Sequence, residues 1–238
     1  MEQGSGDGEG GVRTVLLDAV RATDEALRGL GRAERSADAD ARTEINRVRS
    51  DVRHAARMVL ESLLGRVEME TGREGHSRRV ATTAREIGEA MSLPAETIID
   101  LEEAGRLHDV GELLLDWEHL REPRGLAARE RRSLRRHPTI GQRLLPTVGL
   151  DDEACRIVGA HHERLDGSGY PERLTGALVP VGAQVLAVAE AYEAMTHTRP
   201  HRTAYEPGEA IELLRREAVT GRLSARAIEA LAEIKLTR

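Results

Sequence analysis

The stretch at residues 161–171, HHERLDGSGYP, carries side chains well suited to chemistry. Two adjacent histidines, His161 and His162, open it, and a polar turn leads to Tyr170. Neighbouring histidines in a helical turn point in diverging directions, which is awkward for core packing but suits a pair of metal ions. Gly167 and Gly169 are expected in the turn because a backbone that doubles back often needs a positive φ. Taken alone, the stretch fits a helix end with two partly exposed histidines equally well.

Further histidines and acidic residues lie at or near the ends of expected helices. In the adjacent pair His108-Asp109, the imidazole can bind one ion while the carboxylate bridges two ions about 3.5–4 Å apart. Glu190 lies in an apolar helix and needs a charged partner, because an unpaired buried carboxylate is costly. A mixed imidazole and carboxylate set suits Fe, Mn, Zn or Ni. The candidate metal ligands are His76, His108, Asp109, His137, His161, His162 and Glu190.

The scaffold that must hold these residues is expected to be all-α. Aromatic residues make up 2% of the chain and there is no Phe, so Leu, Val, Ile and Ala must form the core. Few β-branched runs and many Arg and Glu residues favour helices. One long helix is predicted from a stripe of apolar residues at spacings of three and four. The stripe consists of Ile45, Val48, Val52, Ala55, Val59, Leu63 and Val67.

Three segments follow from this pattern. Residues 1–11 are rich in Gly and acidic, and we expect them to be disordered. Residues 12–70 form an N-terminal helical segment, either a hairpin packed on the main domain or a coiled-coil arm that joins two copies. Residues 71–238 form the domain that carries the candidate site.

Composition argues against several classes of partner and location. The net charge of −6 gives no indication of nucleic-acid binding. Cys155 is the only cysteine, so we expect no disulfide and a reducing compartment. The longest apolar stretch, at residues 177–189, contains Pro180 and Gly182 and is too short to span a bilayer. No secretory signal is visible, and we expect a cytoplasmic protein without membrane contact.

The motifs HD at His108, HP at His137 and HHERLDGSGYP together resemble an HD-GYP domain. HD-GYP domains are a branch of the HD-domain phosphohydrolases associated with hydrolysis of cyclic di-GMP in bacterial signalling. The resemblance covers residues 75–234 and implies an HD-domain helical bundle that holds two, sometimes three, divalent transition-metal ions. It implies that the candidate histidines and Asp109 are metal ligands, that Asp109 orients the nucleophile, and that Fe or Mn is favoured over Zn or Ni.

The same resemblance implies substrate contacts. Arg199 and Arg202, in the segment RPHR, match basic residues that contact substrate phosphates, and Gly169 and Tyr170 belong to the GYP loop beside the site. In the family this loop is also linked to protein partners. By analogy with signalling domains that couple to helical stalks, we favour a homodimer formed through the N-terminal helices.

Several positions depart from the family pattern. Glu190 stands where the family has Asp, and Gly72 stands where three-metal members have Glu, which favours two ions. Glu112 replaces a phosphate-contacting Lys, so the sequence predicts weak activity on cyclic di-GMP and a gain on Glu112→Lys. Two alternatives therefore stay open: a phosphohydrolase for another nucleotide or phosphate ester, and a degenerate module that binds without turnover.

Overall fold

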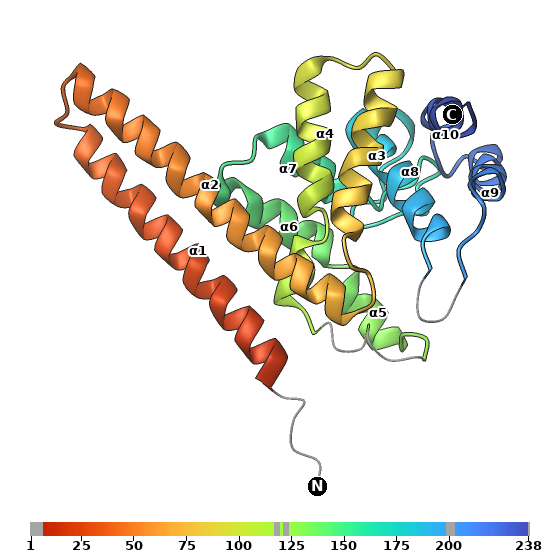
Figure 1. Ribbon diagram of the computed structural model, residues 1–238, viewed down its shortest axis with the longest axis horizontal. Helices are drawn as coiled ribbons and strands as arrows, with labels where there is room; N and C mark the ends of the chain where they lie inside the picture. Colours follow the sequence, from red (N-terminus) through yellow and green to blue (C-terminus); the bar gives the residue numbers. More distant parts are fainter. Residues whose placement is uncertain (1–6, 117–119, 121–123, 199–202, 238) are drawn as a thin grey trace, which may run out of the picture.

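The computed structural model describes residues 7–116, 120, 124–198 and 203–237, and within these ranges the chain is helical and contains no strand. The all-α prediction is confirmed. Figure 1 shows a long antiparallel hairpin of two helices beside a bundle of shorter ones. No helix in the described ranges has the length and apolarity needed to cross a bilayer. The helices are α1 (Asp7–Glu34), α2 (Ala39–Glu70), α3 (His76–Ala90), α4 (Ala95–Leu107), α5 (Ala128–Leu134), α6 (His137–Leu144), α7 (Asp152–Ala160), α8 (Val181–Thr196), α9 (Pro207–Val219) and α10 (Ala225–Leu236).

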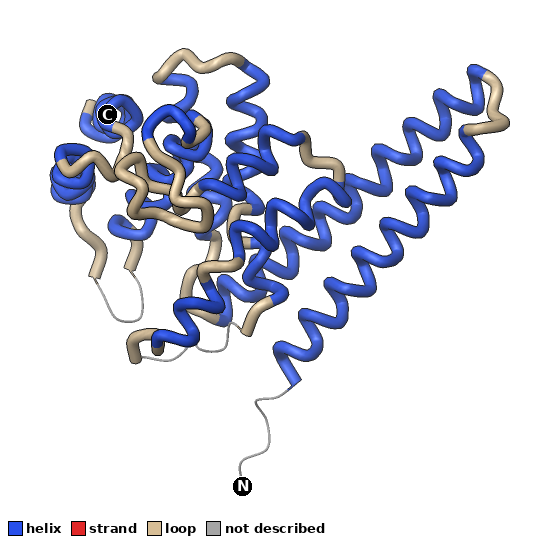
Figure 2. Tube along the Cα trace, turned by 180° about the vertical axis from the view of Figure 1, so that it is seen from behind, coloured by secondary structure: helices blue, strands red, loops and turns tan. Residues whose placement is uncertain are grey.

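The hairpin of α1 and α2 is the N-terminal segment expected from the sequence. Its turn end projects beyond the bundle, as the view from behind also shows (Figure 2). At the other end, Leu16 and Leu60 are buried in the same core as the bundle. The structure thus contains the intrachain hairpin, one of the two arrangements left open. Of the tail expected to be disordered at residues 1–11, residues 7–11 belong to α1, which begins at Asp7, and residues 1–6 lie outside the described residues. Lengthening a helix that is already packed needs no new nucleation, so α1 continues on the N-terminal side of Val12.

The register of the apolar stripe on α2 differs from the prediction. Ala55 is exposed and Val59 is 36% exposed, whereas Ala56, Leu60 and Leu64 are buried. The buried face is therefore displaced by one residue between Ala55 and Leu64, whereas Val67 is buried as predicted. Apolar residues occupy both neighbouring positions, so the sequence offers two stripes, and packing against the bundle determines which is buried.

Close contacts between backbones bring the helix ends together. At Gly105 in α4, a Cβ atom would lie 2.5 Å from the Cα of Ala81 in α3. At Gly111 in the short 3-10 helix η1 (Val110–Leu114), a Cβ atom would collide with the carbonyl oxygen of His137. Since only glycine leaves this space, Gly111 allows the segment after Asp109 to approach the start of α6.

Candidate metal centre

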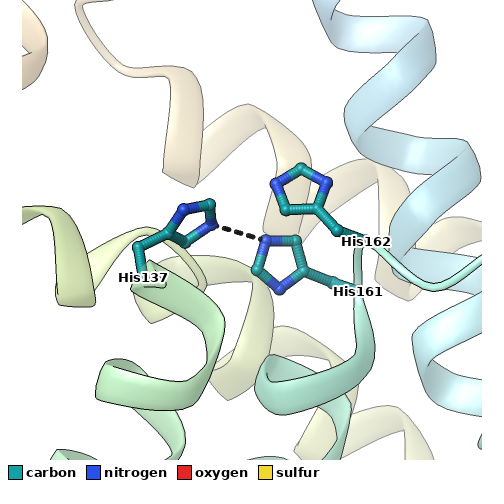
Figure 3. Close-up of side chains that lie close together, drawn as sticks. All are labelled: His137, His161 and His162. Atoms are coloured by element: carbon teal, nitrogen blue, oxygen red, sulfur yellow. Dashed lines mark hydrogen bonds between the residues drawn. The ribbon is translucent and has the colours of Figure 1, made fainter. Parts of the chain in front are cut away.

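The candidate ligands come from the ends of several helices that converge in the bundle. His76 is the first residue of α3, His137 is the first residue of α6, and His161 follows the last residue of α7. His108 and Asp109 link α4 to η1. Figure 3 shows the rings of His137, His161 and His162 close together, although they come from two separate helices. Because the ligands lie at helix ends, their side chains reach the centre while the helices stay regular.

Backbone carbonyl groups fix the tautomers of three of these histidines. His108, His137 and His161 each place Nδ1 against the carbonyl oxygen of the residue three positions earlier. A carbonyl oxygen only accepts, so each Nδ1 carries a proton and Nε2 is the nitrogen that can bind a metal ion. The distances to Gly105, Leu134 and Val158 are 2.9, 2.8 and 2.6 Å, respectively. Burial alone would lower the pKa of His108, but Asp109 raises it to about 9, so its Nε2 keeps a second proton until a metal ion replaces it.

The Nε2 atoms are placed to bind a metal ion rather than to bond to each other. Nε2 of His137 lies 3.1 Å from Nε2 of His161 (Figure 3), and this contact is a hydrogen bond only if one ring takes up a second proton. Burial, reinforced by His137 and His108, holds the pKa of His161 well below its ordinary value, so His161 resists that protonation. In addition, Nε2 of His108 is buried without a hydrogen-bond partner among the described residues. A cation would satisfy both sites.

Asp109 lies between the histidines. Its Oδ1 is 3.3 Å from Nε2 of His137, and its Oδ2 is 3.4 Å from Nε2 of His108. Burial alone would raise the pKa of Asp109, but His108, His137 and Arg73 hold it well below the ordinary value. The carboxylate is therefore ionised and can serve two ions at once. Ligand atoms within 4.8 Å of one another form the groups His76–His108–Asp109, His137–His161–His162 and Asp109–Glu112–His137.

Glu190 and Tyr170 border the centre. Nδ1 of His162 is 3.8 Å from Oε2 of Glu190, beyond hydrogen-bond distance, so the structure brings Glu190 near the cluster without direct contact. The ring of Tyr170 stacks on His162 with centroids 4.7 Å apart. The guanidinium carbon of Arg135 also lies over the Tyr170 ring, 5.1 Å from its centroid. The GYP loop thus contacts the cluster through Tyr170.

The loop itself is held by Glu163, whose role the sequence analysis missed. Its buried carboxylate accepts hydrogen bonds from the backbone N–H groups of Glu172, Arg173 and Leu174. Gly167 has the expected positive φ of 79°, but Gly169 does not, so that prediction is wrong for Gly169. Gly169 instead makes room for the backbone of Glu163, against which a Cβ atom would lie 2.6 Å from the Cα atom.

Arg73, a second residue that the sequence analysis missed, contacts the acidic side of the centre. It donates to Oδ2 of Asp109 at 3.1 Å and to Oε2 of Glu112. Burial alone would lower the pKa of Arg73, but the two carboxylates hold it above the ordinary value, so the side chain is charged. Its place three residues before His76, in the Gly-flanked segment GREG, is the signal that could have identified it.

Two clefts meet at this centre. One, of about 360 Å³, is lined by Arg73, His76, Asp109 and Tyr170 among others. The other, of about 480 Å³, shares Arg73 and His76 with the first. The predicted substrate residues Arg199 and Arg202 lie outside the described residues.

Comparisons with known proteins agree with this geometry. Residues 60–226 match a protein family described as HD domain. A 3'3'-cGAMP-specific phosphodiesterase from Vibrio cholerae is 33% identical over 156 residues, covering 66% of this chain and 36% of the relative. The cyclic di-GMP phosphodiesterase response regulator RpfG from Xanthomonas campestris is 33% identical over 189 residues, covering 76% of this chain and 49% of the relative. The chain thus spans less than half the length of these two relatives.

A solved structure shares the fold. Bd1817, an HDG"Y"P protein from Bdellovibrio bacteriovorus, aligns over 100% of this chain and 75% of its own, with a TM-score of 0.55 and 15% identity. At this level of identity the similarity concerns the fold alone. It extends over the hairpin as well as the bundle, because the whole of this chain is covered.

Proposed function

We propose that this chain, which belongs to the HD domain family and carries an HD-GYP domain, is a metal-dependent phosphodiesterase that opens cyclic di-GMP in bacterial second-messenger signalling. The observation that carries the proposal is the buried cluster of imidazole lone pairs around the ionised carboxylate of Asp109. Such a cluster is costly without cations. The substrate class is proposed from the relatives, which are named as phosphodiesterases for cyclic di-GMP and for 3'3'-cGAMP.

The proposed ligands are the six histidine and aspartate candidates together with Glu190, which hold two divalent ions, with Fe or Mn favoured over Zn or Ni. When bound, a pair of such ions supplies a nucleophile from water near neutral pH and stabilises charge on a phosphoryl oxygen. The chain's own part is to keep Asp109 ionised between the two histidine groups, and to orient each Nε2 through a backbone carbonyl.

The proposed substrate contacts surround this cluster. Tyr170 lines the cleft beside His162, and we propose that Tyr170 and its neighbour Gly169 contact the substrate there. Arg199 and Arg202 are proposed to bind phosphate groups, on the strength of the RPHR segment. Protein partners at the GYP loop and a homodimer through the N-terminal helices stay predictions.

A turnover assay tests the proposal. Purified protein loaded with Mn or Fe is incubated with cyclic di-GMP and, separately, with 3'3'-cGAMP, and the products are resolved by chromatography. We expect metal-dependent opening of cyclic di-GMP, which chelation with EDTA abolishes and Asp109→Asn reduces by a factor on the order of a thousand or more. A fully metal-loaded protein that opens neither compound contradicts the proposal. Turnover of a different phosphate ester would then favour another phosphohydrolase, and binding without turnover would favour a degenerate module.

A further inference from the structure

We propose that Arg73 is a substrate-binding residue, whose guanidinium contacts a phosphodiester oxygen at the edge of the metal centre. The inference rests on the proposed function, because it assigns a phosphate contact to the same site. It concerns a residue outside the ligand cluster and outside the RPHR segment. The argument comes from the loop that holds Arg73, from its hydrogen bonds, and from its place between the two clefts.

The loop between α2 and α3 fixes the backbone of Arg73. Its N–H donates to the carbonyl oxygen of Glu68 at 2.6 Å, and its own carbonyl accepts from the N–H of His76 at 2.9 Å. Gly72 and Gly75 on either side have positive φ angles of 68° and 69°. Because these conformations favour glycine, the sequence encodes a tight loop that holds Arg73 one turn before a candidate ligand.

The side chain is anchored but retains hydrogen-bonding capacity. Nε donates to Oγ1 of Thr71 at 3.1 Å, and the two terminal nitrogens donate to Asp109 and Glu112. A guanidinium has five N–H donors, so three of them have acceptors among the described residues. The two others belong to the terminal nitrogens, on a side chain that keeps 14% of its surface exposed. An anchored guanidinium with spare donors is suited to binding a phosphate, because little entropy is lost on binding.

Arg73 lies where an anionic cyclic dinucleotide would approach the ligand cluster. Arg73 and His76 line both clefts, so the guanidinium lies on the boundary between them. A substrate that occupies either cleft therefore has this cation in the wall beside it. Arg73 pairs with both Asp109 and Glu112, so its positive charge reduces the repulsion that these two carboxylates exert on an anionic substrate.

The competing explanation is that Arg73 only holds Asp109 and Glu112 in place. Removing Arg73 would then alter metal content and leave substrate affinity unchanged. Three variants separate the two roles. Arg73→Gln removes the charge, Arg73→Lys keeps the charge but loses the planar fork, and Arg78→Gln is a matched control on an exposed residue of α3 that lines neither cleft.

The experiment measures equilibrium binding of cyclic di-GMP by isothermal titration calorimetry, with each protein first freed of metal by dialysis against EDTA. We expect Arg73→Gln to weaken affinity by roughly 10–100-fold, from one charge-assisted contact. The affinity of Arg73→Lys for cyclic di-GMP should lie between those of the wild type and Arg73→Gln. The affinity of Arg78→Gln should equal that of the wild type. Equal affinity of wild type and Arg73→Gln, including the case in which neither binds measurably, overturns the inference.

Two further measurements complete the test. Metal analysis after reloading with Mn should give the same content in Arg73→Gln as in wild type, and KM should rise more than kcat falls. A variant that loses metal while KM stays constant would make Arg73 a positioning residue and overturn the substrate contact. Failure of the Mn-loaded wild type to open cyclic di-GMP would refute the proposed function instead, and the metal-free binding comparison does not depend on turnover.

Discussion

Nε2 of His137 and Nε2 of His161 lie 3.1 Å apart with a backbone carbonyl fixing the proton of each ring on Nδ1. Two acceptors at this distance repel each other unless a cation or a proton lies between them. Asp109 is 3.3 Å from the same nitrogen of His137, so negative charge is adjacent to the two lone pairs. The helix ends are thus arranged to bind positive charge, and removal of that charge should have measurable consequences.

The first prediction concerns metal content. We expect the purified protein to contain about two transition-metal ions per chain, because the ligands outnumber what one ion needs. Asp109→Ala should lose at least one ion, since its carboxylate lies between the two histidine groups. Inductively coupled plasma mass spectrometry measures this content. His54→Ala, an exposed histidine on α2, is the control and should retain both ions. A wild-type protein that stays empty after incubation with Mn, Fe and Zn would contradict the prediction.

The second prediction concerns Gly111. A methyl group there would collide with the carbonyl oxygen of His137, so Gly111→Ala should push η1 away from α6. The free energy of unfolding should fall by about 1–3 kcal/mol, which is typical of overpacking. Because Asp109 moves with η1, metal content should fall as well. Gly125→Ala is the matched control, since a Cβ at Gly125 has no neighbour within 4 Å. Urea denaturation and metal analysis of both variants test this, and an unchanged Gly111→Ala protein would refute it.

The third prediction compares two adjacent leucines of α1. Leu16 is fully buried in the core shared with the bundle, whereas Leu17 is 43% exposed. Leu16→Ala should lower the free energy of unfolding by about 2–4 kcal/mol, as expected for a cavity in a core. Leu17→Ala should cost about 0.5 kcal/mol or less if its surface faces solvent. A large loss in Leu17→Ala would instead indicate that this face is covered by a second copy, and light scattering at high micromolar concentration would then show a dimer.

Much of the centre could be predicted from the sequence because its residues lie at helix ends. An HD pair, an HP pair and the HHE stretch each mark a break in a helical pattern, and helix ends in a bundle converge. The register of α2 was not predictable in the same way. Ala55 and Ala56, like Leu63 and Leu64, are equally apolar neighbours, so periodicity alone permits two faces. Packing against the rest of the chain determines which one is buried.

Other features depend on contacts between distant residues. Gly169 was correctly identified as a position that requires glycine, but the reason is the backbone of Glu163 and not a positive φ. Either reason selects the same residue type, so the sequence does not distinguish them. The pairing of Arg73 with Glu112 joins residues on separate segments, and charge alone gives no indication of which of the many arginines is the partner.

The fourth prediction concerns Glu112 and reverses what the sequence suggested. From the family pattern, Glu112→Lys should raise turnover by restoring a cation that contacts phosphate. In the structure, Glu112 already pairs with Arg73, and its side chain is only 4% exposed. A Lys at this position would face the guanidinium of Arg73 at close range, and two buried like charges repel. We therefore expect Glu112→Lys to displace Arg73 from Asp109, to raise KM, and to lower the free energy of unfolding by about 3–5 kcal/mol, as when a buried ion pair is broken.

Two further variants isolate the charge effect. Glu112→Gln keeps an oxygen that can accept a hydrogen bond from Arg73. It should therefore raise KM less, and lower the free energy of unfolding less, than Glu112→Lys does. The double variant Arg73→Glu with Glu112→Lys reverses the pair and should recover stability relative to Glu112→Lys, while KM stays high if Arg73 is the residue that contacts the phosphate. Steady-state kinetics at equal metal loading and urea denaturation of the four proteins measure these effects. A single Glu112→Lys variant with higher turnover and unchanged stability would show that position 112 accepts the cation of the family pattern, and that Arg73 does not depend on Glu112 for its place in the site.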